Sequence, residues 1–116
     1  MDFHDELKLT MHKYVKFIYK ITKKFPKDEL YGVTSQIRRS SISVILNYIE
    51  SYARRRGHGC KIYKNFLEIS YGSLKESKYL LYFSLEEKYI TAGEYNEGFA
   101  MADKIGKMLW PIIKDK

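Results

Sequence analysis

Two rows of side chains with opposite character run along the start of this chain at helical spacing. Lysines recur three and four residues apart, at Lys13, Lys16, Lys20, Lys23 and Lys27. Apolar side chains recur with the same spacing, at Met11, Tyr14, Ile18, Ile21 and Phe25. At about 100° per residue the two rows lie on nearly opposite faces of one helix. The apolar face has to be buried, which predicts a packed helix bundle with a basic exterior.

Turn signals divide the chain into four expected helices with short connections. The first helix ends before Pro26, because the residue that precedes a proline disfavours the α region. The second ends near Gly57-His58-Gly59, where paired glycines mark a turn. Thr91-Ala92-Gly93-Glu94 has the spacing of a capping box and begins the fourth helix, which runs to about residue 113. The first three helices are expected at residues 4–24, 28–54 and 60–88.

Short connections between long helices favour antiparallel neighbours. We therefore expect an all-α protein, an antiparallel up-down-up-down four-helix bundle, in a single domain that spans residues 1–116. No apolar run approaches the roughly 18 residues of a membrane span, and the acidic start of the chain is unlike a signal peptide. The one cysteine, Cys60, excludes an internal disulfide and suits the cytoplasm, so we expect a cytoplasmic protein without a membrane partner.

The net charge of +7 is unevenly distributed along the sequence. Residues 1–27 hold seven lysines and three acids, and residues 28–60 hold five arginines and three acids. Residues 91–116 are neutral, with four charges of each sign. A basic half joined to a balanced half predicts a surface that faces a polyanion, RNA or DNA. The alternative is that the lysine-rich face is simply solvated.

The candidate nucleic-acid contacts are the cations of the first helix and the arginines at the two ends of the second. They are Lys13, Lys16, Lys20, Lys23, Lys24, Lys27, Arg38, Arg39, Arg54, Arg55 and Arg56. The guanidinium fork matches phosphate oxygens, and lysines along the side of a bundle read phosphate rather than bases. As an alternative, Arg38 or Arg39 pairs with Glu50 or Glu76 to orient subunits. Tyrosines could stack on unpaired bases, although their apolar positions favour packing.

The second helix carries more apolar surface than one shared core requires. One stripe contains Leu30, Val33, Ile37, Val44 and Tyr48, and a second, turned by about 100°, contains Ile42, Ile45, Ile49 and Tyr52. The third helix is also apolar on two sides, and its small residues Ser70, Gly72, Ser73 and Ser77 would allow close helix approach. Surplus apolar patches usually mark a partner site, so we expect a homo-oligomer. The alternative is one thick core filled by tyrosines.

The expected oligomer interface consists of Ile42, Ile45, Asn47, Ile49, Glu50 and Tyr52. Asn47 and Glu50 are polar residues in an apolar stretch, and buried polar groups of this kind can fix register and oligomer state. A catalytic role for the carboxylate of Glu50 is the alternative, and it lacks a visible partner in the sequence.

The sequence also resembles a known family, first through Phe25-Pro26-Lys27-Asp28-Glu29-Leu30-Tyr31-Gly32-Val33-Thr34-Ser35-Gln36-Ile37-Arg38-Arg39-Ser40-Ser41. The resemblance continues through Asn47, Glu50, Gly72-Ser73-Leu74-Lys75-Glu76 and Tyr89-Ile90. These segments are similar to the four-helix-bundle proteins encoded in intervening sequences of bacterial 23S ribosomal RNA. That family is related to the accessory variability proteins of diversity-generating retroelements. The resemblance implies a homopentameric ring with a basic surface or channel, nucleic-acid binding and, in the retroelement members, a reverse transcriptase as partner.

Four positions depart from the pattern of that family. Ser51 and Ala53 stand where glycines are common, which predicts a more continuous end of the second helix. Ile45 stands where a proline is common, and Lys78 stands where an acid is common. These four departures leave the fold assignment unaffected.

The sequence gives little support to an enzyme. His4, His12 and His58 show no spacing typical of a metal site in a helix bundle, and no phosphate loop, nucleophile elbow or dinucleotide fingerprint occurs. His58 and Cys60 form at most a weak two-ligand pair on a loop. We expect a non-enzymatic protein without catalytic residues, metal or cofactor. The alternatives are a protein–protein interaction module without nucleic-acid binding, and a hydrolase that depends on Glu50 or His58.

Overall fold

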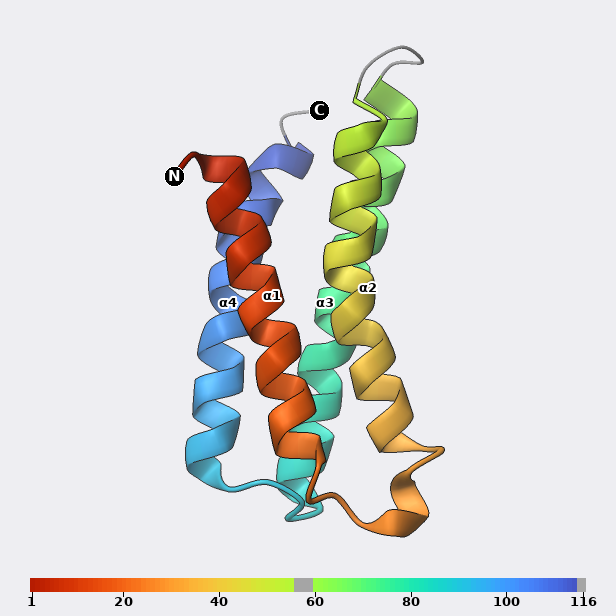
Figure 1. Ribbon diagram of the computed structural model, residues 1–116, viewed down its shortest axis with the longest axis vertical. Coiled ribbons are helices and arrows are strands. Elements are labelled where there is room, and N and C mark those ends of the chain that lie inside the picture. Colours follow the sequence, from red (N-terminus) through yellow and green to blue (C-terminus); the bar gives the residue numbers. More distant parts are fainter. Residues whose placement is uncertain (56–59, 115–116) are drawn as a thin grey trace.

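The computed structural model describes residues 1–55 and 60–114. Within these residues there are four α-helices, one short 3-10 segment and no strand, which confirms the expected number of helices. The elements are α1 (Phe3–Thr22), η1 (Lys27–Glu29), α2 (Val33–Ala53), α3 (Cys60–Glu86) and α4 (Ala92–Lys114). Figure 1 shows that the α1–α2 and α3–α4 connections lie at one end of the molecule, whereas the two termini lie together at the other end.

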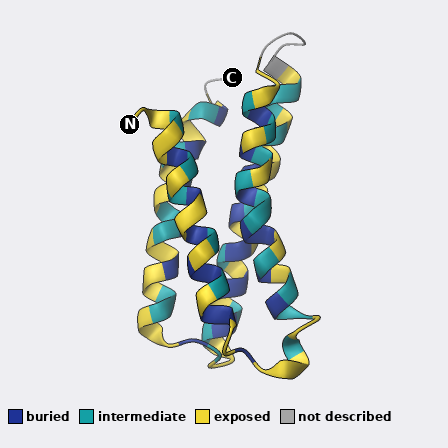
Figure 2. Ribbon diagram, viewed as in Figure 1, coloured by how far each residue is buried: buried dark blue, intermediate teal, exposed yellow. Residues whose placement is uncertain are grey.

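Each helix packs against two neighbours in a closed order. Helix α2 contacts α1 and α3, and α4 contacts the same two helices. The apolar row of α1 faces the centre of this arrangement and is buried along its whole length, as its spacing predicts. Buried residues form inward-facing stripes on all four helices in Figure 2. The buried residues of α1 are Leu7, Met11, Tyr14, Phe17, Ile18, Ile21 and Thr22.

Small hydroxyl side chains lie between α2 and α3. The Ser70 hydroxyl donates to the carbonyl of Val44 at 2.6 Å, which links the backbone of one helix to a side chain of the other. The hydroxyls of Ser43 and Ser73 lie 2.7 Å apart across the same helix pair. The small residues of α3 predict a close approach of two helices, and these contacts confirm it for Ser70 and Ser73. Gly72 is exposed and does not contribute to it.

The start of α2 differs from the sequence-based expectation, which placed it at residue 28. The chain first forms the 3-10 turn Lys27–Glu29, and Gly32 then adopts a non-helical backbone conformation with φ −114° and ψ −116°. The Glu29 carboxylate accepts a hydrogen bond of 3.3 Å from the Val33 N–H, one of the N–H groups that lack a partner at a helix start. Leu30 therefore precedes the helix and is 48% exposed, although the apolar stripe predicted it in the core.

The connection between α3 and α4 contains the predicted capping box. The Thr91 hydroxyl accepts from the Glu94 N–H at 3.1 Å, and the Glu94 carboxylate accepts from the Thr91 N–H at 2.9 Å. The α3 helix ends at Glu86, two residues earlier than expected, because Lys88 adopts a left-handed backbone with φ 63°. None of the described helices combines the length and the apolar character that crossing a bilayer requires.

Candidate nucleic-acid interface

Four lysines form a continuous basic surface along the outer side of α1. This lysine row consists of Lys13, Lys16, Lys20 and Lys23, which are all exposed. The same four residues line a shallow groove that also includes Ile42 of α2 and Met101 of α4. None of the ion pairs recorded among residues 1–55 and 60–114 uses a lysine of this row. Four ammonium groups are therefore available to an external anion on one helix face.

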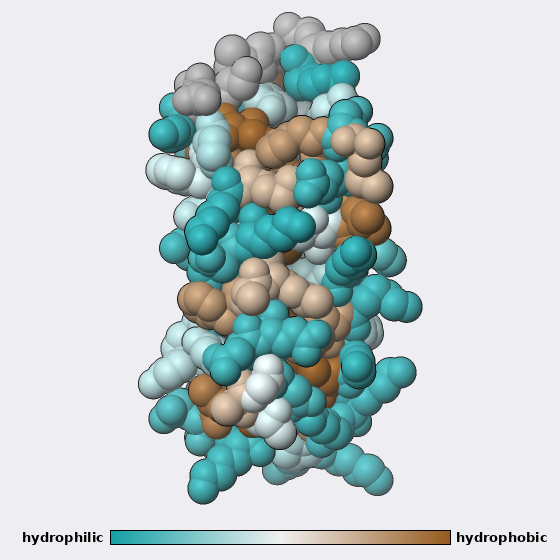
Figure 3. All heavy atoms as spheres, turned by 90° about the vertical axis from the view of Figure 1, so that its left-hand side faces the viewer, coloured by the Kyte–Doolittle hydropathy of each residue, from teal (hydrophilic) through white to brown (hydrophobic). Residues whose placement is uncertain are grey.

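The face of the molecule that carries α1 and α4 is not uniformly polar. In Figure 3, hydrophilic side chains project along its whole length, and apolar side chains are visible between them. Leu9 and Val15 lie beside the lysines in the groove. A ligand that carries both phosphates and apolar groups could contact lysines and apolar side chains together on this face.

The other two candidate lysines near the end of α1 lie outside the lysine row. Lys24 forms a salt bridge with Glu94 at the start of α4, so its charge is already paired. Lys27 is exposed but belongs to the 3-10 turn, where the backbone has left the axis of α1. The basic surface on α1 is therefore shorter than the periodicity of the sequence predicts.

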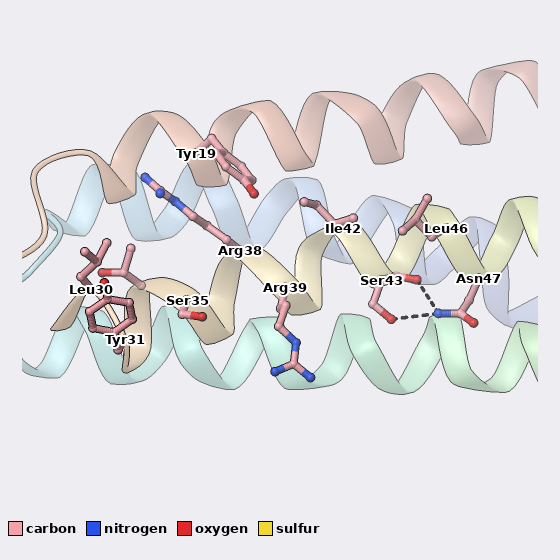
Figure 4. Close-up of a pocket in the computed structure, with 11 residues that line it drawn as sticks. Tyr19, Leu30, Tyr31, Ser35, Arg38, Arg39, Ile42, Ser43, Leu46 and Asn47 are labelled. Carbon is pink, nitrogen blue, oxygen red and sulfur yellow. Dashed lines mark hydrogen bonds between the residues drawn. The ribbon is translucent and has the colours of Figure 1, made fainter.

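Arg38 and Arg39 point in opposite directions from the same turn of α2, as Figure 4 shows. Arg38 reaches toward α1, where its Nε donates to the Thr22 hydroxyl at 2.8 Å and its guanidinium lies 4.7 Å from the ring centre of Tyr19. Arg39 is exposed and lies in a polar groove toward α3 that also contains Glu76. Arg38 thus stabilises the α1–α2 contact, and Arg39 is the one of this pair with its charge toward solvent.

The arginines at the end of α2 contact residues of the preceding turn. The Nε of Arg54 lies 3.1 Å from a Glu50 carboxylate oxygen, in an i,i+4 ion pair. The Arg55 guanidinium lies 3.6 Å from the ring centre of Tyr52 and donates to the Tyr52 carbonyl at 2.8 Å. Arg56, the third predicted contact here, lies outside the described residues. Arg54 and Arg55 are both exposed, and Arg55, which forms no recorded ion pair among the described residues, adds positive charge to this end of the bundle.

An aromatic cluster that sequence reasoning did not single out joins the start of α1 to the end of α2. The ring of His4 stacks on Tyr52 with a centroid distance of 3.5 Å, and its Nδ1 lies 2.9 Å from the Tyr48 hydroxyl. Burial, followed by the charge of Lys8, lowers the pKa of His4 from its usual 6.5. Burial also raises the pKa of Tyr48 to about 12, with Tyr63 as the next cause. A lone histidine near the chain start gave no pattern that could have indicated this cluster.

The outer face of α2 is apolar and partly open to solvent. Leu46 is 57% exposed and Ile49 is 46% exposed, and Ile42 lines an open pocket between α1 and α2. Ile45, from the same predicted stripe, instead packs partly against the core of the bundle. The sequence reasoning missed Leu46, which the second stripe should have included at helical spacing.

The two polar residues of the predicted interface do not contact each other in the subunit. The Asn47 side-chain amide donates to both the carbonyl and the hydroxyl of Ser43, each at 2.9 Å, as the dashed lines in Figure 4 show. The Glu50 carboxylate forms an ion pair with Arg54, the residue that follows α2. The Asn47 amide nitrogen therefore has its partners within α2, and one Glu50 carboxylate oxygen has its partner at the C-cap of α2.

The described residues contain no group of three or more histidine, cysteine, aspartate or glutamate side chains that could hold a metal ion. His58 lies outside the described part of the chain, as does the side chain of Cys60. The hydrolase alternative thus rests on Glu50, whose carboxylate is paired with Arg54.

The fold and the charged surface define a class, that of small basic all-helical four-helix-bundle proteins. The chain belongs to the 23S rRNA-intervening sequence protein family, whose sequence pattern matches residues 6–110. A solved structure with the same fold is that of a protein of unknown function from the S23 ribosomal protein family of Bacteroides thetaiotaomicron VPI-5482. It has a TM-score of 0.85 and 23% sequence identity, and the match covers 97% of this chain and 99% of that one. The comparison with curated proteins found no match.

Proposed function

We propose that this protein is a non-enzymatic, basic helix-bundle scaffold that binds the phosphate backbone of nucleic acid, RNA or DNA. The observation that carries the proposal is the lysine row, four exposed ammonium groups on one helix face without an acidic partner among the described residues. Lysine contacts to phosphate supply affinity with little sequence discrimination. Arg39 and Arg55, which are exposed and form no recorded ion pair among the described residues, add positive charge on α2 and at its end.

We further propose that antiparallel up-down-up-down bundles of this chain assemble into a homo-oligomer, a homopentameric ring. The support within the subunit is the apolar outer face of α2, where Leu46 and Ile49 are about half exposed. Ile69 on α3 is exposed to a similar extent. Exposed aliphatic side chains on adjacent helices are typical of an interface between proteins. The ring itself follows from the family resemblance.

The resemblance to accessory variability proteins adds a specific role to this proposal. In that role the ring would act beside a reverse transcriptase and present a nucleic acid to it. The second candidate function is a protein–protein interaction module without nucleic-acid binding, which the exposed leucine and isoleucines on α2 and α3 favour. Both candidate functions involve self-assembly. They differ in whether the lysine row binds the phosphates of a nucleic acid.

The experiment that tests nucleic-acid binding replaces Lys13, Lys16, Lys20 and Lys23 by glutamate. Its matched control replaces four other lysines by glutamate and so makes the same change in net charge. These are Lys61, Lys64, Lys88 and Lys114. Binding of a labelled RNA is measured by fluorescence anisotropy at several salt concentrations, and circular dichroism confirms that both variants fold. The lysine-row variant should lose binding and the control should retain most of it.

The salt dependence gives a second readout of the same proposal. Each phosphate contact on a single strand contributes a slope of about −0.7 to the logarithm of affinity against the logarithm of salt. Four contacts therefore predict a slope of about −3 for the natural protein and a much smaller one for the lysine-row variant. Equal losses in the two variants, or no binding at physiological salt, would leave the protein-interaction module as the better function.

Assembly is tested separately by light scattering. A ring of five subunits of 13.8 kDa would have a mass of about 69 kDa. Replacing Leu46 and Ile49 by glutamate should dissociate it, because two charges would be buried without partners in the interface. A natural protein that scatters as a monomer would contradict the proposed assembly without bearing on the lysine row.

A further inference from the structure

A second basic groove lies between α3 and α4, formed by other residues than the lysine row. Its walls include Tyr71, Lys75 and Lys78 from α3, and Lys107 and Trp110 from α4. We call this the α3–α4 groove. Its volume of about 350 Å³ is within the range of about 300–1,000 Å³ for small-ligand pockets. None of these five residues belongs to the surfaces described above.

Two aromatic rings make one wall of the α3–α4 groove. The ring centres of Tyr71 and Trp110 lie 5.3 Å apart at an interplanar angle of 37°, so the rings support each other across the two helices. Trp110 is 47% exposed, although an indole is among the largest apolar surfaces a protein can bury. A large, rigid, half-exposed ring backed by a second ring is a surface on which another flat ring can stack.

Three lysines line the α3–α4 groove together with these rings. The Lys75 ammonium lies 5.4 Å from the ring centre of Tyr71, and the Lys78 ammonium lies 4.6 Å from that of Phe99. Lys107 is already paired with Asp103 at 3.0 Å. Lys75 and Lys78 form no recorded ion pair in the described part of the chain. Lys75 therefore places an unpaired positive charge beside the stacking surface, and Lys78 adds a second unpaired charge to the α3 wall of the groove.

One residue of the groove lining has no side chain. Gly106 lines the groove, and a Cβ added there would meet only Leu74 of α3, at 3.6 Å. At 3.6 Å this contact would be an ordinary one, so the packing of α3 against α4 does not require a glycine at position 106. Gly106 therefore adds only backbone atoms to the lining of the groove.

We propose that the α3–α4 groove binds unpaired nucleotides of a single-stranded nucleic acid, with a base stacked on Trp110 and Tyr71 and phosphates beside Lys75 and Lys78. Aromatic rings in a positively charged groove are the combination that single-strand-binding proteins use. A duplex keeps its bases stacked inside and offers this groove phosphates only. The inference rests on the proposed function and deepens it, since it names unpaired nucleotides as the preferred ligand.

The test uses Trp110 as its own reporter, because it is the one tryptophan in the chain. The 116-residue chain is titrated with a ten-nucleotide oligouridylate, the oligodeoxyuridylate of the same length, and an RNA duplex of equal length. Both single strands should quench the fluorescence of Trp110, and the duplex should leave it nearly unchanged. A difference between the two single strands would tell whether RNA or DNA is preferred.

Variants measured by anisotropy of a labelled oligonucleotide complete the test. Loss of one stacked base typically weakens binding by about 5- to 150-fold, and we expect that effect for Trp110→Ala. Trp110→Phe keeps a ring and should restore most of the affinity. The matched control is Tyr79→Ala, which removes an exposed aromatic ring of α3 outside the groove and should have no effect. Lys75→Glu together with Lys78→Glu should weaken binding and reduce its salt dependence.

The outcomes separate this inference from the proposed function. Anisotropy that reports binding while Trp110 is neither quenched nor required overturns the groove and leaves the lysine row intact. Equal quenching by duplex and single strand overturns the preference for unpaired nucleotides. Quenching that grows with protein concentration alone would show that a second copy of the chain covers the groove, and this also overturns the inference. Absence of binding in every measurement overturns both proposals.

Discussion

The hydroxyl of Tyr14 lies 2.7 Å from the hydroxyl of Ser77 in the centre of the bundle, where both side chains are fully buried. This contact joins α1 to α3 across the core. Ser77 donates its one hydrogen to the Leu74 carbonyl at 2.8 Å, so Tyr14 is the donor between the two hydroxyls. Burial raises the pKa of Tyr14 far above its usual value of 10, and Ser77 offsets this only in part. Tyr14 therefore stays protonated and able to donate at physiological pH.

Ser77→Ala should destabilise the protein more than Tyr14→Phe does. The serine variant leaves the buried Tyr14 hydroxyl without a partner, which costs about 1–3 kcal/mol, whereas the phenylalanine variant loses one net hydrogen bond, about 0.5–1.5 kcal/mol. The free energy of unfolding from urea denaturation measures both. The double variant should cost less than the sum of the two, and strict additivity would show that the hydroxyls do not interact.

Gly98→Ala should lower the free energy of unfolding relative to Gly72→Ala. A Cβ at Gly98 would lie 2.9 Å from the ring of Phe17 and 3.1 Å from Leu81, so the core has to shift. Overpacking of this kind costs about 1–3 kcal/mol. A Cβ at the exposed Gly72 meets nothing within 4 Å and brings only the better helix propensity of alanine, about 1 kcal/mol. Equal effects of the two substitutions on thermal unfolding would contradict the close packing of α4.

Thr91→Ala should weaken the start of α4, and Glu94→Gln should remove the charge that pairs with Lys24 while keeping an oxygen that can accept from the Thr91 N–H. Loss of a helix cap typically costs about 1 kcal/mol, and the structure shows both bonds of the capping box. Burial acts to raise the pKa of Glu94, but Lys24 and Thr91 outweigh it, so the net pKa lies below the usual 4.5. Stability from this carboxylate is present above pH 4.5 and is lost as the pH falls through its folded-state pKa. Glu94→Gln should therefore have a flatter acid denaturation profile, and a profile identical to that of the natural protein would rule this out.

His4 should titrate below pH 6.5 in the folded protein. Burial against the tyrosines of α2 is the main cause, and the positive charge of Lys8 adds to it, while Asp5 and Asp2 oppose it. A histidine whose folded pKa is lowered contributes stability above pH 6.5 that is lost as the pH falls toward the folded value. Proton NMR titration measures the pKa directly. Tyr52→Ala exposes the ring and should raise the pKa toward 6.5, whereas a His4 pKa above 6.5 in the natural protein would contradict the stacked arrangement.

The lysine row and the core of α1 could be predicted from the sequence because both are set by the geometry of a single helix. Residues three and four apart share a face whatever the helix packs against. The exposed Lys13 and Lys16 and the buried Tyr14 and Ile18 confirm that prediction. The capping box at Thr91 was predictable for the same reason, since its two hydrogen bonds close within four residues.

The contacts of the arginines on α2 could not be predicted from helical spacing. Arg38 and Arg39 are adjacent in the sequence, yet one donates to Thr22 of α1 and the other lies toward α3. Their contacts depend on which helix lies on each side of α2. The same holds for Asn47, whose amide is satisfied by Ser43 of its own helix.

The sequence by itself determined the four helices, the buried and basic faces of α1 and the family to which the chain belongs, because these follow from local periodicity and local motifs. The tertiary structure alone decided that Lys24 is neutralised by Glu94 and that Arg38 is held against Tyr19. It also brought Tyr71 and Trp110, far apart in the chain, to within 5.3 Å across two helices. Helical periodicity gives each side chain a direction relative to its own axis, but the partner it meets there depends on how the helices pack together.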